Sequence, residues 1–164
     1  MLGGFPCGAR FMNNKIIEIR GQPRPDLVKK IQKRINRKFP KDFVELVSFH
    51  DGPEFEREIV DFYNVEANCR DQTSLGIIFS FDPLYPCERF VDTLDSPPEF
   101  FPSGHNLVAF GRDGSGNLFC FDYRENPETD NPSIVLWHVE GEGISFIAED
   151  FSALINNLEP VRTD

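Results

Sequence analysis

A glycine-rich segment, GRDGSGNLFCFD at residues 111–122, is the first part of the sequence that could carry chemistry. A phosphate loop needs a helix after its glycines and either a following Lys or GxGxxG spacing, and this segment has neither. A calcium loop would need a side-chain ligand at Gly111 and a long carboxylate at Asp122. We therefore predict a β-hairpin turn in which Gly114 and Gly116 supply positive φ between two strands, with no metal and no cofactor.

The other residues that could do chemistry are scattered. The three histidines form no short metal-ligand pair such as HExxH, and no serine lies in a nucleophile-elbow context. The four cysteines have no CxxC spacing and follow no export signal, so we expect free thiols in a reducing cytoplasm. Cys120, between Phe119 and Phe121, is expected in the core. We therefore expect no catalytic residue and no enzymatic activity.

Composition favours one globular domain. The chain has 164 residues, 17 of them Phe, and 27% are charged, which is typical of a packed protein rather than a disordered one. The sequence shows no signal peptide and no apolar run of the roughly 18–20 residues that would cross a bilayer. We expect a cytoplasmic protein that does not insert into membranes.

The net charge of −10 is unevenly distributed. Residues 27–41 carry seven Lys or Arg and no acid, so the rest of the chain has a net charge of −17. An acidic body repels nucleic-acid and membrane phosphates and attracts basic partners. The basic segment has helical spacing but no interleaved aromatic residues, which favours a solvated helix face over a nucleic-acid site.

Apolar spacing, prolines and glycines predict an α+β order of elements. Two helices are predicted to begin at Pro25 and Pro40, and the helix that begins at Pro40 should end near Gly52. Two more helices are predicted at residues 87–94 and 148–158. The predicted strands are an edge strand at 14–20, then 58–65, 75–83, 106–111, 117–124 and 133–140. Residues 66–74 are interpreted as one or two helical turns and residues 95–105 as a loop. We assign residues 25–164 to one domain and residues 1–24 to an N-terminal lead-in.

The last three predicted strands should form an antiparallel meander. Phe110, Phe119 or Cys120, and Trp137 are expected to contribute to its core.

Four stretches, taken in order, resemble the SUKH superfamily, which includes fungal Smi/Knr-type cell-wall regulators. They are FPKDFVELVSFHDGP, LVAFGRDGSGNLFCFDYRE, SIVLWHVE and IAEDFSALI. The matching positions are Pro40, Asp42, Phe43, Gly111, Asp113, Gly114, Gly116, Val135, Trp137, Glu140, Phe151 and Leu154. The resemblance covers about residues 25–158 and is loose between Glu54 and His105.

The resemblance implies an α+β fold in which helices pack on a largely antiparallel, twisted sheet, and it implies no catalysis. Bacterial members of the superfamily are chiefly cytoplasmic immunity proteins that bind and block a toxin domain, often a nuclease. The expected function is therefore neutralisation of a cognate toxin with a basic surface. The alternative is a regulatory or scaffolding module like the fungal relatives.

Acidic side chains in the turns of the meander are the candidate partner-binding residues. Acidic side chains would complement a basic toxin surface, because opposite charges accelerate association and favour the correct partner over others. Alternate turns of a meander lie at opposite ends of the sheet, so the first and third groups should lie together and the second apart. The three groups are Asp113; Glu125, Glu128 and Asp130; and Glu140 and Glu142. His138 is expected to make a surface contact beside Glu140.

Overall fold

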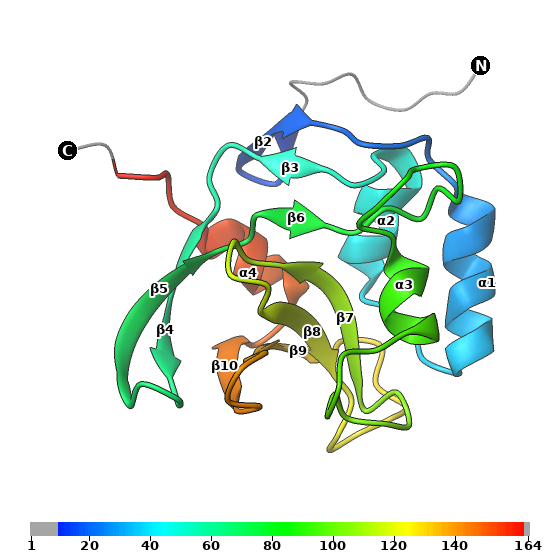
Figure 1. The fold of residues 1–164 in the computed structure, drawn as a ribbon. Helices are drawn as coiled ribbons and strands as arrows, with labels where there is room; N and C mark the ends of the chain where they lie inside the picture. The colour runs from blue at the N-terminus through cyan, green and yellow to red at the C-terminus, as the bar shows by residue number, and fades with distance from the viewer. Residues whose placement is uncertain (1–9, 163–164) are drawn as a thin grey trace.

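The structure, a computed structural model, describes residues 10–162 and has the α+β fold predicted from the sequence (Figure 1). Within these residues the helices are α1 (Pro25–Ile35), α2 (Lys41–Phe49), α3 (Phe90–Asp95) and α4 (Phe151–Asn157). The strands are β1 (Arg10–Phe11), β2 (Asn14–Glu18), β3 (Glu54–Phe55), β4 (Ile59–Asn64), β5 (Cys69–Ser74), β6 (Ile77–Ile78), β7 (Leu107–Arg112), β8 (Leu118–Asp122), β9 (Ser133–Trp137) and β10 (Ile144–Ala148). No helix of this part of the chain is long and apolar enough to cross a membrane.

A five-stranded antiparallel sheet is the centre of the molecule, in the order β10-β9-β8-β7-β6. The predicted meander of β7, β8 and β9 is confirmed, and Cys120 of β8 lies opposite Val135 of β9. Phe119, Cys120 and Phe121 follow one another in β8, so their side chains point to alternate faces of the sheet, yet all three are fully buried. Both faces of the sheet are therefore covered, and for this reason the pattern in β8 is apolar throughout.

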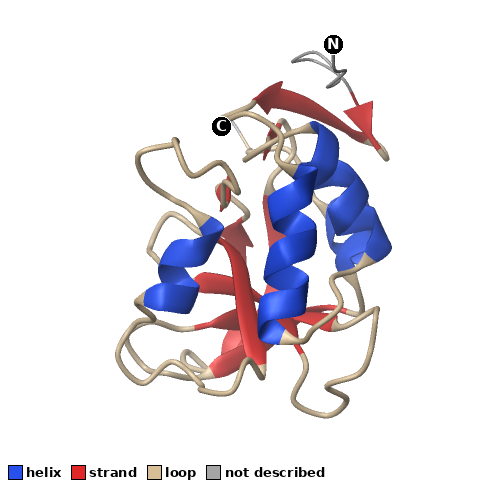
Figure 2. Ribbon diagram, turned by 90° about the vertical axis from the view of Figure 1, so that its right-hand side faces the viewer, coloured by secondary structure: helices blue, strands red, loops and turns tan. Residues whose placement is uncertain are grey.

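Figure 2 shows the helices lying over the sheet, and aromatic side chains pack between them. Phe43 of α2 contacts Phe121 and Phe151 edge to face, and Phe110 stacks on Phe121 with 4.4 Å between the ring centres. Offset and edge-to-face aromatic pairs are favourable beyond the apolar area that they bury. These rings fix α2 and α4 on the sheet.

The first two helices begin where their prolines predict. Pro25 opens α1, and Pro40 directly precedes α2. A proline costs nothing at a helix start because its missing N–H would have no partner there. Gly52 has the predicted left-handed conformation, with φ of 56°, although α2 has already ended at Phe49.

The strand predicted near residue 14 is confirmed as β2, but its edge position is wrong. β2 pairs with β1 on one side and with β3 on the other, and Ile16 is fully buried opposite Phe55. The Asn14 side chain also bonds both backbone groups of Arg57. The part of the chain assigned to a lead-in therefore includes a strand that packs with the rest.

The prediction of helical turns at residues 66–74 is wrong. Residues 69–74 are β5, which pairs with β4 from Asn64–Cys69 to Ile59–Ser74. Asn64 Oδ1 accepts hydrogen bonds from the N–H groups of Glu66 and Ala67, and Asn68 is left-handed with φ of 55°. Asparagine tolerates this conformation and bonds nearby backbone, so the chain reverses here and returns as a strand.

The C-terminal helix begins later than predicted. Residues 144–148 form β10, which the sequence reading missed, and α4 starts at Phe151. Asp150 caps this helix, because its side chain accepts a hydrogen bond of 2.8 Å from Ala153 N–H. Capping by an aspartate just before the first helical residue is a strong start signal.

Candidate functional site

The glycine-rich turn is built around the carboxylate of Asp113. One carboxylate oxygen accepts hydrogen bonds of 2.9 Å from the N–H groups of Ser115 and Asn117. The other accepts from the Asn117 side chain at 3.0 Å and from Thr73 Oγ1 at 2.8 Å. Gly116 has the predicted positive φ, 87°, whereas the same prediction for Gly114 is wrong, so one glycine is enough for this bend. Asp113 is therefore buried and holds the predicted turn together, rather than facing a partner.

Glu140 and Glu142 lie exposed in the turn between β9 and β10. This turn is closed by hydrogen bonds from His138 N–H to Gly143 O and from Glu142 N–H to His138 O. The Asn117 side chain accepts a hydrogen bond of 3.0 Å from Val139 N–H. The first and third turns of the meander therefore lie together, as predicted.

A third turn, missed in the sequence, completes this end of the molecule. Glu66 lies between β4 and β5, and its carboxylate accepts a hydrogen bond of 2.5 Å from Gly143 N–H. The same carboxylate lies so close over Gly141 and Gly143 that a Cβ on either would overlap it. Two glycines in the β9–β10 turn thus make room for Glu66. The paired asparagines Asn64 and Asn68 are the sequence signal that could have revealed this turn.

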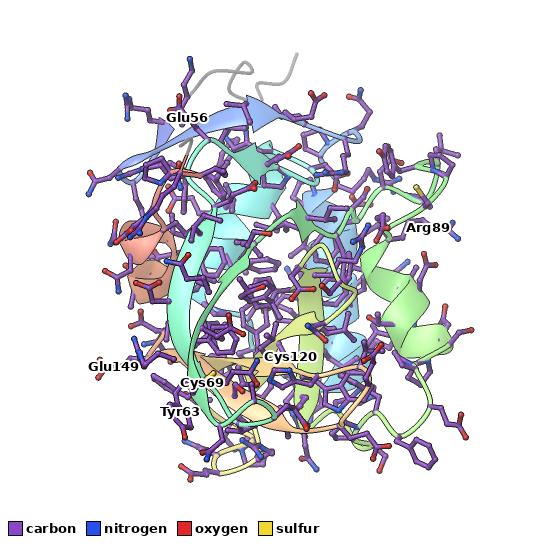
Figure 3. The ribbon with its side chains drawn as sticks, turned by 60° about the vertical axis from the view of Figure 1, so that its left-hand side comes forward. Glu56, Tyr63, Cys69, Arg89, Cys120 and Glu149 are labelled. Carbon is purple, nitrogen blue, oxygen red and sulfur yellow. The ribbon has the colours of Figure 1, made fainter. Side chains whose placement is uncertain are left out.

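We call the surface made by turns 65–68, 113–117 and 138–143 the three-turn surface. It encloses a hollow of about 560 Å³. The lining residues are Glu66, Ser115, Asn117, His138, Val139, Glu140 and Gly141. Figure 3 looks onto this side of the molecule and labels Tyr63 and Cys69 near the end of the β4–β5 hairpin. Of the predicted partner-binding residues, Glu140 lines this hollow.

His138 supports the floor of this hollow and is not the surface contact that was expected. His138 is 6% exposed and lies just after the end of β9 at Trp137. A hydrogen bond of 2.7 Å joins its Nε2 to Ser145 Oγ, which also accepts from Val65 N–H. Burial lowers the pKa of His138 and outweighs the opposing effect of Glu66, Asp113 and Asp71. The ring is therefore uncharged near neutral pH and leaves the acid of the hollow unbalanced.

The second predicted group lies at the other end of the sheet. Glu125, Glu128 and Asp130 are exposed in the loop between β8 and β9. This loop reaches α1, because Glu128 lines a smaller hollow with the basic side chains of the helix and the residues after it. The cations there are Lys29, Lys33, Arg37 and Lys38. Acid in this loop is thus set against local positive charge.

The histidine and cysteine side chains, which could take part in chemistry, lie in different parts of the structure. The three histidines line three separate hollows. Burial raises the pKa of the Cys120 thiol well above its ordinary value, which suppresses the reactive thiolate. Within residues 10–162, no group of three or more His, Cys, Asp or Glu side chains could hold a metal ion.

The chain matches the model of the SMI1 / KNR4 family (SUKH-1) over residues 22–157. This range includes the four described helices and the whole five-stranded sheet. The chain therefore belongs to this family, which confirms the resemblance inferred from its sequence. No match was found among curated proteins.

Proposed function

We propose that this chain is a non-catalytic immunity protein of the cytoplasm, which binds a cognate toxin domain and neutralises it by covering it. The observation that carries the proposal is membership of the SMI1 / KNR4 family (SUKH-1) over residues 22–157. The resemblance set out above links bacterial members chiefly to immunity against toxins. A fold used in this way acts as a binding scaffold.

The charge of the molecule supports a basic partner. A nuclease toxin must carry positive charge where it holds phosphates, and the chain has a net charge of −10. Complementary charge accelerates association and disfavours wrong partners. An acidic protein that occupies such a surface would exclude the nucleic acid without any chemical step.

The proposal assigns no catalytic residue. His50, His105 and His138 lie in different hollows, so they do not form a common acid–base site. Inhibition would then be stoichiometric, with one chain occupied for each toxin domain blocked.

Co-expression tests this proposal. The gene for this chain and a toxin gene adjacent to it are expressed together and separately in a sensitive host. We expect the toxin by itself to stop growth, and the two together to permit growth and to purify as one complex. Growth arrest in the presence of the chain, or the absence of any adjacent toxin gene, would contradict the immunity role and favour a regulatory or scaffolding module.

A further inference from the structure

We propose that the three-turn surface is the docking surface for the partner, and that the partner presents an apolar side chain surrounded by Lys or Arg. The identity of the partner rests on the proposed function. The location and chemistry of the surface rest on the exposed apolar side chains and the charges of the three turns.

Exposed apolar side chains lie at this surface. Val139 lines the hollow, and the side chain of Val65 lies against Gly143 across from it. Tyr63 is on β4, two residues before Val65, and lies beside the 65–68 turn, because its hydroxyl donates a hydrogen bond to Asn68 Oδ1. All three are exposed. Tyrosine is among the side chains that most often act as anchors of protein interfaces, and Val65 and Val139 extend the apolar area beside Tyr63.

The charge around these apolar side chains selects the occupant. Glu66, Glu140 and Glu142 lie in the three turns, which contain no Lys or Arg. Within residues 10–162, no Lys or Arg forms an ion pair with these carboxylates. An acidic partner would be repelled, whereas a basic one would neutralise all three charges. The surface therefore fits an apolar anchor with a basic surround.

The opposite end of the sheet lies outside the proposed surface, so Glu125 and Glu128, which the sequence had made candidates for partner binding, now provide a matched control. Glu125 and Glu128 are exposed loop carboxylates like Glu140 and Glu142, but Glu128 lies beside Lys29 and Lys33. A double substitution to Lys at either end changes the net charge by the same amount. Any difference between the two variants therefore reports position and not total charge.

The first measurement compares affinities of the full chain for the purified toxin domain of the adjacent gene. We expect E140K/E142K to weaken binding about 30-fold or more, and Y63A/V139A to do likewise, as interface anchors do. The controls E125K/E128K and Phe100→Ala should change the affinity by less than about threefold; Phe100 is an aromatic side chain that is 69% exposed. Circular dichroism and melting temperature establish that each variant is folded.

The second measurement uses two cysteines already in the chain. Cys69 and Cys87 are free and exposed; Cys69 begins β5 next to the 65–68 turn, and Figure 3 places it far from Arg89, which follows Cys87 by two residues. A bound partner should slow alkylation of Cys69 about tenfold or more, as a covered interface site, and leave Cys87 unchanged. Equal protection of both, or protection of Cys87 only, would overturn the proposed location.

The possible results of these measurements test the proposed surface and the proposed immunity role separately. Toxin binding that E140K/E142K leaves intact, with Cys69 still reactive, would contradict the surface while the immunity role survives. If the toxin does not bind at all, the immunity role fails, and a synthetic peptide of alternating lysine and leucine serves as the probe in both measurements. Protection of Cys69 by this peptide, lost in E140K/E142K but kept in E125K/E128K, would support the surface; any other pattern would overturn it.

Discussion

The carboxylate of Asp113 stabilises the turn in which it lies. Four donors converge on its two oxygens, and two of these are backbone N–H groups of its own turn. An alanine would leave buried donors without a partner, which costs about 1–3 kcal/mol. We expect Asp113→Ala to lower the free energy of unfolding in urea by about 2 kcal/mol, and Asp113→Asn to lower it less. The exposed Asp130→Ala is the control, and equal stability of all three variants would contradict this role.

The histidines make stability depend on pH. Burial lowers the pKa of His50, His105 and His138, so each is protonated more easily in the unfolded chain. The stability that the neutral rings contribute is complete above about pH 6.5 and is lost as the pH falls towards their lower folded pKa values. Desolvation raises the pKa of Asp51, which is buried, and of Glu58, which is half-buried. These two carboxyls therefore lower the stability as the pH rises above their ordinary pKa of about 4.

We therefore expect the free energy of unfolding to fall as the pH is lowered from about 6.5 to about 5.5, below the ordinary pKa of histidine. Urea unfolding at a series of pH values measures this change, and histidine NMR signals give the individual pKa values. Constant stability over that range, together with ordinary histidine pKa values, would show that burial does not act as described.

At the scale of elements, Gly111 allows β6 to approach β7. A Cβ on Gly111 would overlap the backbone carbonyl oxygen of Ile77, whereas a Cβ on Gly114 would meet nothing within 4 Å. Backbone cannot move aside as a flexible side chain can, so Gly111→Ala should destabilise the protein by about 1–3 kcal/mol, as overpacking does. Gly114→Ala is the matched control and should be nearly neutral. Similar melting temperatures for both variants would contradict the close packing of these strands.

β2 offers a second test, because it places two isoleucines side by side in different surroundings. Ile16 is fully buried and Ile17 is 43% exposed. Ile16→Ala should cost about 2–5 kcal/mol of unfolding free energy, as deletions from a core do, and Ile17→Ala much less. Chemical denaturation of the two variants gives the comparison, and equal losses would mean that β2 does not pack on β3 as a core strand.

Several elements could be predicted because their local signals agree with their tertiary surroundings. Val28, Ile31 and Ile35 recur at helical spacing and are the buried residues of α1. The glycine turn between two apolar runs indicates the β7–β8 hairpin. In such segments, periodicity and turn chemistry point to the same structure.

The missed elements lacked that agreement. β5, CRDQTS, is mostly exposed and carries little strand pattern, so its partner β4 decides its conformation. Because this hairpin was not predicted, Glu66 could not be recognised as a site residue. The 65–68 turn, one of the three turns of the three-turn surface, was therefore missed. The sequence also placed Asp113 in the right turn but could not reveal that its carboxylate turns inward, since that depends on Thr73, 40 residues away.

At the scale of the whole molecule, charge is separated between the two ends of the sheet. The basic helix α1 lies beside the β8–β9 loop, and the three-turn surface lies at the opposite end. Surface charges are screened by salt over about 10 Å at 0.1 M. Association with a basic toxin should therefore slow as salt rises in the wild-type chain, and this dependence should be weaker in E140K/E142K than in E125K/E128K. Stopped-flow association rates measure it, and identical salt dependence in both variants would contradict the role of charge position.

Titration of the toxin's own activity with increasing amounts of this chain tests the immunity role most directly. Because inhibition is proposed to occur by occupation, we expect activity to fall in proportion to the chain added and to vanish at one chain per toxin domain. The released toxin, separated from the complex under denaturing conditions and refolded, should be active again. Full toxin activity beyond a one-to-one ratio, or lasting inactivation of many toxin molecules by one chain, would contradict stoichiometric binding.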